Sequence, residues 1–188
     1  MAFLFDLTFF ILLVFYLFLN FIYFFILKKI IIIDAFILMF FYLIRVVSGH
    51  LINHIDYSIW IISFVFFIFL SLSFLKKYID LKLTNGENNI MNYSMKDLFF
   101  LQSIGITTAI ASSLVILLYC NSESTKLLYN NNVYLTFISP LILYWILNTW
   151  HKGIRDKIKI DPVTFVAKNI YTYIVLISIA SLIILAKI

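Results

Sequence analysis

Residues 3–49 read FLFDLTFFILLVFYLFLNFIYFFILKKIIIIDAFILMFFYLIRVVSG, and this stretch decides the fold. It holds two apolar runs, 3–27 and 30–49, and each is long enough for a helix to cross the hydrocarbon core, which needs about 20 residues. Little more than Lys28 and Lys29 separates the runs, so the two spans must form a tight helical hairpin. Both runs are continuously apolar and do not alternate, which excludes a transmembrane β-barrel.

The rest of the chain continues this pattern with four more apolar runs, at 57–75, 98–119, 133–150 and 169–186. The composition is 64% hydrophobic and 12% charged, with a mean hydropathy of +1.06, whereas a soluble domain is about a quarter charged. No soluble fold of this size can bury so much apolar surface. The sequence therefore predicts an integral membrane protein, built as one all-α bundle of six spans over residues 1–188.

The basic residues predict the orientation of the bundle. Eleven of them fall in the first, third and fifth loops and two fall on the opposite side: Lys28, Lys29, Lys76, Lys77, Lys82, Lys96, Lys152, Arg155, Lys157, Lys159 and Lys168, against Lys126 and Lys187. Basic loops stay in the cytoplasm, so we expect a bacterial inner-membrane protein with both termini external. The net charge of +5 then reflects topology and not binding to nucleic acid. A first span that enters from outside without a signal peptide suggests that an odd number of helices is missing ahead of Met1.

The third span ends in a polar stretch with candidate site residues, SLSFLKKYIDLKL at 71–83. If the helix continues, Asp80 shares a face with Lys76 by i,i+4 spacing and with Lys77 by i,i+3 spacing. Two ammonium groups and the Tyr78 phenol near a carboxylate suit a phosphate that carries Mg²⁺. The alternative is an ordinary basic helix end whose lysines reach up to the head groups. The spacing leaves both interpretations open.

Two further charged positions stand out. Arg45 lies inside the second span, where a guanidinium normally faces a polar cavity or a partner; the alternative is that it snorkels to the external surface. Asp34 lies on nearly the same face of that helix, eleven residues earlier. Asp161 and Pro162 predict a helix start, with Asp161 as the N-cap.

Taken in order, several features resemble the C-terminal two-thirds of UbiA-type membrane prenyltransferases, in the branch of the decaprenyl-phosphate phosphoribosyltransferases. The positions that carry the resemblance are Asn20, Tyr23, Lys28, Asp34, Arg45, Gly49, Lys76 to Leu81, Tyr144, Trp145, Trp150, Arg155, Asp161 and Pro162. The resemblance implies a fold of nine helices around a cavity, in which two acidic motifs hold Mg²⁺ and a diphosphate. The six spans here would correspond to the last six helices, and the family's first acidic motif is absent from this sequence. The resemblance therefore implies a truncated product, one half of a split enzyme or a degenerate paralogue.

The resemblance further implies transfer of a prenyl or phosphoribosyl group between a diphosphate donor and an acceptor, one of them a polyprenyl lipid. Substrate-binding roles are implied for Lys28, Arg45, Lys76, Lys77, Tyr78 and Arg155, and a Mg²⁺-binding role for Asp80. Lys77 stands where the family has Arg, Asp80 where it has Glu, and Asp156 where it has Gly. We expect partners in the membrane lipid, in a polyprenyl phosphate or diphosphate, and in a separate chain that supplies the first acidic motif. By itself, this chain should show little or no activity.

The rival interpretation is a protein without catalytic activity, either a small transporter or a membrane assembly partner. A transporter should show two matching half-repeats with broken helices, and none is visible by eye in the sequence. An assembly partner requires a neighbouring chain that bears the missing acidic motif. The donor, the acceptor and the lipid length are not defined by the sequence.

Overall fold

The computed structural model describes residues 7–53, 58–84 and 93–187, and within these ranges the chain forms helices and loops with no strand. The predicted all-α class is confirmed. The long helices are α1 (Leu7–Phe25), α2 (Ile33–Asn53), α3 (Ile59–Leu83), α4 (Leu98–Cys120), α7 (Ile138–Ile154) and α9 (Ile170–Lys187). The short ones are η2 (Leu27–Lys29), η4 (Met95–Asp97), α5 (Glu123–Leu128), α6 (Val133–Thr136) and α8 (Pro162–Lys168).

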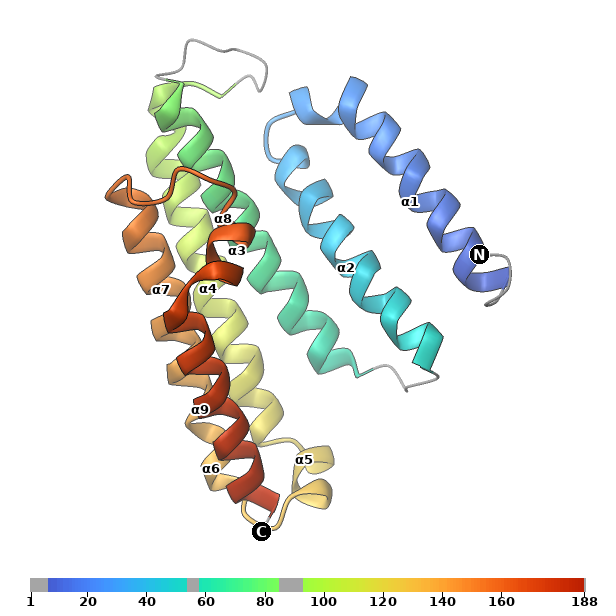
Figure 1. Ribbon diagram of the computed structural model, residues 1–188, viewed down its shortest axis with the longest axis vertical. Coiled ribbons are helices and arrows are strands. Elements are labelled where there is room, and N and C mark those ends of the chain that lie inside the picture. Colours follow the sequence, from blue (N-terminus) through green and yellow to red (C-terminus); the bar gives the residue numbers. More distant parts are fainter. Residues whose placement is uncertain (1–6, 54–57, 85–92, 188) are drawn as a thin grey trace.

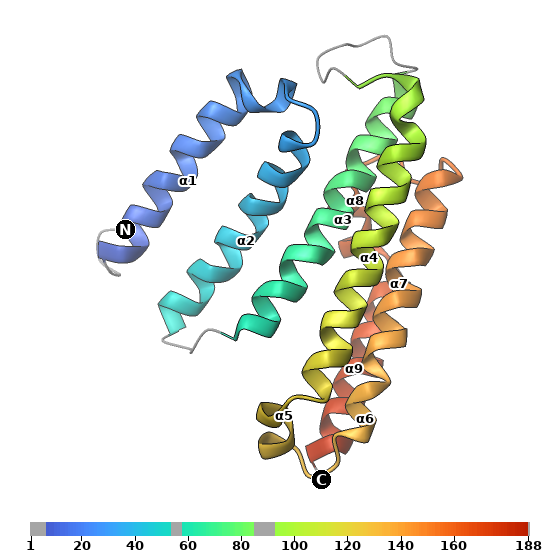
Figure 2. The ribbon, with the colours of Figure 1, turned by 180° about the vertical axis from the view of Figure 1, so that it is seen from behind.

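The long helices form a bundle with a hairpin beside it (Figures 1 and 2). The most extensive packing is between α3 and α4; α7 packs on α4, and α9 packs on α7. The α1–α2 hairpin reaches the bundle through contacts between α2 and α3. Figure 1 shows η2, η4 and the loop after α7 at one end of the molecule, with α5 and α6 at the other. The described parts of the three basic loops therefore share one end, which we call the basic end.

Four stretches of helix are long and apolar enough to cross a membrane: Ile59–Leu83, Met95–Cys120, Val133–Ile154 and Ile170–Lys187. A shorter apolar helix runs over Phe9–Phe25. Large apolar side chains cover the outside of the molecule, including Phe21 and Ile177, which are 66% and 70% exposed. Apolar surface on this scale is stable in contact with lipid and not with water. The protein is thus an integral membrane protein.

A close contact fixes α3, α4 and α7 against one another. The indole of Trp150 is almost fully buried and lies against Gly105, where an added Cβ would come within 2.0 Å of the ring. The Ser71 hydroxyl accepts a hydrogen bond from Trp150 Nε1 at 2.9 Å and donates one to the Gly105 carbonyl at 2.7 Å. Small residues let membrane helices approach this closely. This contact holds α3 in place below the basic end.

The turn after α7 forms with Asp156 at the position where the resemblance expects glycine. Asp156 adopts φ 56°, a left-handed conformation that Asp tolerates better than most residues. The Lys157 N–H bonds to the Lys152 carbonyl at 3.0 Å, as in a normal helix C-cap. Lys82 on α3 pairs with the Asp156 carboxylate at 2.7 Å and donates to the Ile154 carbonyl at 2.8 Å. The turn is therefore retained and tied to α3.

Candidate functional site

Helix α3 continues beyond residue 75, where its apolar run ends, to Leu83, so it presents Lys76, Lys77 and Asp80 on helical geometry. Lys77 is buried and its Nζ lies 2.7 Å from Asp34 Oδ2; the two side chains are 2% and 0% exposed. Asp34 lies in the first turn of α2. Removing one partner of such a pair leaves an uncompensated buried charge, which is strongly unfavourable. The pair therefore fastens the start of α2 to the end of α3.

Tyr93 completes the environment of Asp34 from the segment just before α4. Its hydroxyl donates to Asp34 Oδ1 at 2.9 Å and accepts from the Ile32 N–H at 2.7 Å. Ile32 has φ 71°, an unfavourable conformation for a β-branched residue, and its N–H is directed at this hydroxyl. Burial raises the pKa of Tyr93, so the phenol stays protonated and remains a donor. Three segments of the chain therefore meet at the Asp34 carboxylate: the start of α2, the end of α3 through Lys77, and the segment before α4 through Tyr93.

Lys76, the residue before Lys77, pairs with a different element. Its Nζ lies 2.9 Å from Asp161 Oδ1, and both side chains are about one-third exposed. Asp161 also accepts a hydrogen bond from the Thr164 N–H at 3.3 Å, and Pro162 is the first residue of α8. The predicted N-cap is confirmed. In addition, Asp161 fastens the start of α8 to α3, a role that local sequence did not indicate.

Asp80 is partly buried one helical turn after Lys76, and no ion pair forms between the two. The ion-pair cluster, as we call it, consists of Asp34, Lys76, Lys77, Asp80 and Asp161. It holds one more carboxylate than ammonium groups, so an entering phosphate would need to bring its own cation. The described residues contain no group of three His, Cys, Asp or Glu side chains arranged to hold a metal.

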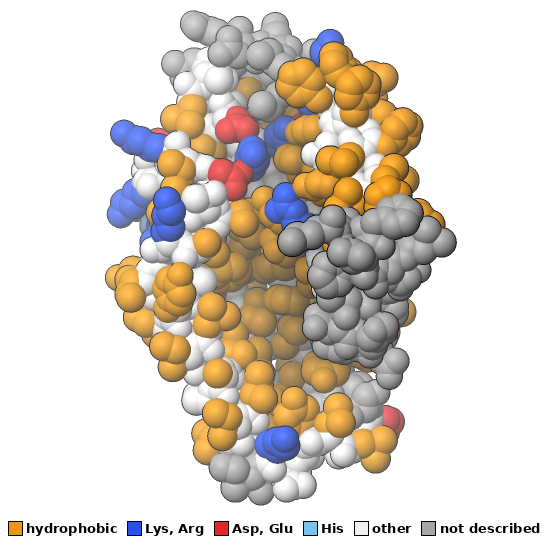
Figure 3. All heavy atoms as spheres, turned by 45° about the vertical axis from the view of Figure 1, so that its right-hand side comes forward, with side chains coloured by type: hydrophobic (Ala, Val, Ile, Leu, Met, Phe, Trp, Pro, Cys, Tyr) orange, Lys and Arg blue, Asp and Glu red, His pale blue; other side chains and the backbone are white. Residues whose placement is uncertain are grey.

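An apolar cavity of about 560 Å³ adjoins the cluster, lined by residues of α3, α4, α7, α8 and α9 among others. Leu72 in its wall is one helical turn before Lys76, and Val163 is two residues after Asp161. Trp145 Nε1 donates to Thr172 Oγ1 at 3.0 Å within the same wall. Figure 3 shows a hollow lined by hydrophobic side chains, with acidic and basic side chains at its upper end. The arrangement suits an amphiphile with a charged head and an apolar tail.

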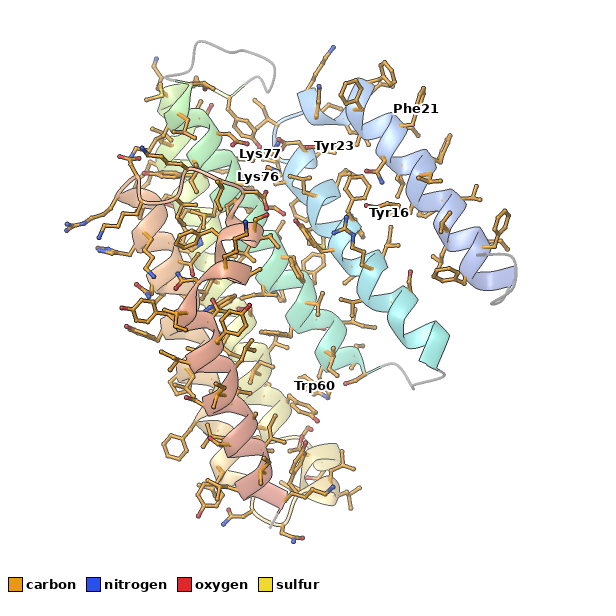
Figure 4. The ribbon with its side chains drawn as sticks, viewed as in Figure 1. Tyr16, Phe21, Tyr23, Trp60, Lys76 and Lys77 are labelled. Carbon is orange, nitrogen blue, oxygen red and sulfur yellow. The ribbon has the colours of Figure 1, made fainter. Side chains whose placement is uncertain are left out.

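The other predicted site residues lie apart from this cluster. Tyr78 is buried in the core with its ring edge-on to Trp150 at 5.9 Å, and Arg155 is exposed at the end of α7. Lys28 lies in η2 with its Nζ 4.2 Å from the Phe24 ring centroid. Of the seven predicted residues, the structure brings Lys76, Lys77 and Asp80 together. Figure 4 shows the first two at the end of α3 beside the α1–α2 hairpin.

Arg45 is exposed on α2 and faces α1. Its Nη2 donates to the Tyr16 hydroxyl at 2.9 Å, and its guanidinium carbon lies 5.8 Å from the Tyr16 ring and 5.3 Å from the Tyr42 ring. The Tyr42 ring stacks on Phe69 of α3, with centroids 4.4 Å apart and planes 7° from parallel. Tyr42 therefore stands between Arg45 and the wall of the apolar cavity, which includes Phe69.

Comparison with known proteins adds one relative. No family model matches the chain. The chain is 27% identical over 166 residues to "Uncharacterized protein y4nM" of Sinorhizobium fredii (strain NBRC 101917 / NGR234). The matched region covers 85% of this chain and 32% of that protein. The chain thus spans about a third of the length of the curated relative that it matches. No solved structure matches the chain. Fold and site define an all-α integral membrane protein with a charged cluster beside an apolar cavity.

Proposed function

We propose that the chain is the C-terminal six-helix part of a UbiA-type membrane transferase. The complete enzyme transfers a prenyl or phosphoribosyl group between a diphosphate donor and an acceptor, one of which is a polyprenyl lipid. The proposal rests on one observation: the end of α3 carries two adjacent lysines, Lys76 and Lys77, and one helical turn earlier Leu72 lines an apolar cavity of about 560 Å³. In this proposal the six spans of the chain cross a bacterial inner membrane, and the basic end lies in the cytoplasm.

Within this proposal the two lysines have different roles. Lys77 holds Asp34 in a dry environment and fixes the end of α3, whereas Lys76 is partly exposed and is available for exchange. An entering phosphate displaces Asp161 from Lys76, because an ammonium group binds a phosphate at least as well as it binds a carboxylate. Asp161 then joins Asp80 as a free carboxylate at the mouth of the cavity.

Those two carboxylates match the oxygen donors that Mg²⁺ prefers, and Mg²⁺ usually keeps several waters and binds substrate phosphates as well. Bound Mg²⁺ would stabilise negative charge on the departing diphosphate. The chain's own residues bind the substrate: Lys76 holds the phosphate, and the apolar walls of the cavity hold the lipid and exclude water from the reacting carbon. The family's first acidic motif, which the resemblance implies but this sequence lacks, would come from another chain or segment.

Binding of a polyprenyl phosphate to the purified protein in nanodiscs tests this proposal. We expect Lys76→Met to weaken binding about tenfold or more, because one charge-assisted hydrogen bond is lost. Lys126→Gln is the control: this exposed lysine lies on α5 at the far end and pairs only with Glu123 in the described structure. Equal binding by wild type and Lys76→Met would contradict the proposal.

The transfer reaction is a separate measurement. Radiolabelled phosphoribosyl diphosphate is supplied with Mg²⁺ and a polyprenyl acceptor, radiolabelled prenyl diphosphate is supplied with Mg²⁺ and a non-lipid acceptor, and product is followed by thin-layer chromatography. The 188-residue chain alone should give little or no product. Robust Mg²⁺-dependent transfer by this chain would show that the missing first acidic motif is not needed.

A further inference from the structure

Arg45 carries a charge for which the described structure provides no counter-charge. Of the four cations on α2 and α3, Lys76, Lys77 and Lys82 each pair with a carboxylate, whereas no carboxylate among the described residues lies within ion-pair distance of Arg45. The residue lies near the middle of α2, about 12 Å of helix rise from its end at Asn53. A guanidinium at membrane depth normally faces an anionic or polar partner.

The aromatic side chains around Arg45 hold it in one orientation. The Tyr16 hydroxyl takes one N–H at 2.9 Å, and the rings of Tyr16 and Tyr42 lie within 6 Å of the guanidinium. Stacking on Phe69 fixes Tyr42 in turn. A guanidinium has five N–H donors in a rigid fork, and most of them remain for a ligand after the bond to Tyr16. The residue is therefore pre-oriented for a planar or tetrahedral oxyanion.

A second cavity of about 490 Å³ opens at this guanidinium. Its other lining residues are mostly apolar and come from α1 and α2: Phe9, Leu12, Leu13, Tyr16, Ile44, Ser48 and Gly49. Ser48 directs its hydroxyl to the Ile44 carbonyl at 2.7 Å and so adds little polarity to the wall. At Gly49 an added Cβ would meet nothing within 4 Å, so this wall has room. A cation in an apolar wall matches an anion on an apolar body.

We propose that Arg45, held between Tyr16 and Tyr42, forms a second anion-binding subsite, which takes the phosphate or carboxylate group of a membrane amphiphile. The amphiphile enters between α1 and α2, and its apolar part occupies the second cavity. The subsite extends the proposed function because a transferase holds two substrates, and this position would hold the one that the ion-pair cluster does not bind. Its physical basis is separate from the cluster, so the subsite can be tested alone.

Dodecyl phosphate is the probe, with the protein in nanodiscs of phosphatidylcholine and binding followed by native mass spectrometry. Measurements are made in the Lys76→Met background, so that binding at the ion-pair cluster is weakened. We expect saturable binding of one dodecyl phosphate, weakened tenfold or more by Arg45→Gln and less by Arg45→Lys, which keeps the charge but loses the fork. Tyr16→Phe should weaken binding modestly, and Lys126→Gln should leave it unchanged.

Inorganic phosphate distinguishes a membrane amphiphile from free phosphate as the source of the anion. Weak binding of inorganic phosphate supports an amphiphile; Arg45-dependent binding as tight as that of dodecyl phosphate would reject the amphiphile and leave a free-phosphate site. Equal binding of dodecyl phosphate by Arg45→Gln and its parent would show that Arg45 only snorkels, and would overturn the subsite. A melting temperature within about 2 °C of the parent shows that each variant is folded. The effect of Lys76→Met on polyprenyl phosphate binding tests the proposed function independently of the Arg45 subsite.

Discussion

Gly105 is a residue at which α4 and α7 approach closely. We predict that Gly105→Ala destabilises the protein by about 1–3 kcal/mol, because the new Cβ would lie 2.0 Å from the buried Trp150 ring and the indole has no free space. Gly49→Ala is the matched control: nothing lies within 4 Å, and alanine favours helix by up to about 1 kcal/mol. Unfolding in detergent measures both. Equal stability of the two variants would disprove the tight contact.

At Lys77 the relevant quantity is the free energy of unfolding. Lys77→Met leaves the fully buried Asp34 carboxylate without its ion-pair partner, and we expect a loss of about 3–5 kcal/mol. The double variant Asp34→Asn with Lys77→Met should recover most of this loss, because the asparagine oxygen still accepts from Tyr93. Lys76→Met is the comparison, with an expected loss below about 1 kcal/mol because its pair is partly exposed. A double variant no more stable than Lys77→Met would argue against an isolated buried charge.

The lysines of the candidate site were easier to predict than the carboxylates with which they form ion pairs. Lys76 and Lys77 were identified because charges that follow an apolar run are conspicuous. Helical spacing then suggested Asp80 as a shared partner, whereas the structure pairs the lysines with Asp34 and Asp161 on other elements. Long lysine side chains reach across to a neighbouring helix, and one sequence does not show which helix that is. Tyr93 gave no signal, since one tyrosine in a polar loop has no diagnostic pattern.

At the scale of the element, Tyr93 fixes the segment that leads into α4. We predict that Tyr93→Phe costs about 1–3 kcal/mol, because the Ile32 N–H loses its acceptor and Asp34 loses a donor. Chemical unfolding of wild type and variant at about pH 7 measures the loss. Phenylalanine keeps the ring, so packing is the same in both proteins. A loss below about 0.5 kcal/mol would show that the hydroxyl does not hold the segment.

The same comparison has a predicted dependence on pH. Burial raises the pKa of Tyr93 above its ordinary value of 10.0, so in the unfolded chain this phenol loses its proton at lower pH than in the folded protein. The stability that the phenol contributes is therefore fully present below about pH 10 and is lost as the pH rises towards the folded pKa. The difference in unfolding free energy between wild type and Tyr93→Phe should be constant from about pH 6 to 9 and shrink above pH 10. A constant difference up to pH 11 would contradict the raised pKa.

Helix limits were predictable where hydropathy and helix end coincide. Helix α4 covers Leu98–Cys120 against an expected 98–119, because turn residues follow the apolar run directly. In contrast, α3 runs to Leu83 although the apolar run stops at 75. The loss of hydropathy marks where a chain leaves the hydrocarbon region, and a helix continues past that level while its backbone bonds are satisfied. The short helix α5 has no span-length apolar signal, so no helix was expected there.

For the whole molecule, orientation in the membrane is open to direct measurement. In a Cys120→Ser background, a cysteine at exposed Lys159 marks the basic end and one at exposed Asn121 marks the opposite end. In intact bacterial cells, a membrane-impermeant maleimide should label the cysteine at 121, whereas the cysteine at 159 should react only after permeabilisation. The reverse pattern would invert the topology. Labelling of both in intact cells would contradict a single crossing between them.

The order of synthesis gives the buried ion pair a further consequence. N-terminal segments leave the ribosome first, so the α1–α2 hairpin enters the membrane before Lys77 and Tyr93 have been made. Until then the Asp34 carboxylate depends on water and lipid head groups at the membrane surface, which the basic end can provide. Its burial becomes favourable only when α3 and the segment up to Tyr93 arrive. Chains truncated between α2 and α3 should therefore leave Asp34 without Lys77 and Tyr93, so the α1–α2 hairpin reaches its final depth only after α3 and the segment up to Tyr93 have been made.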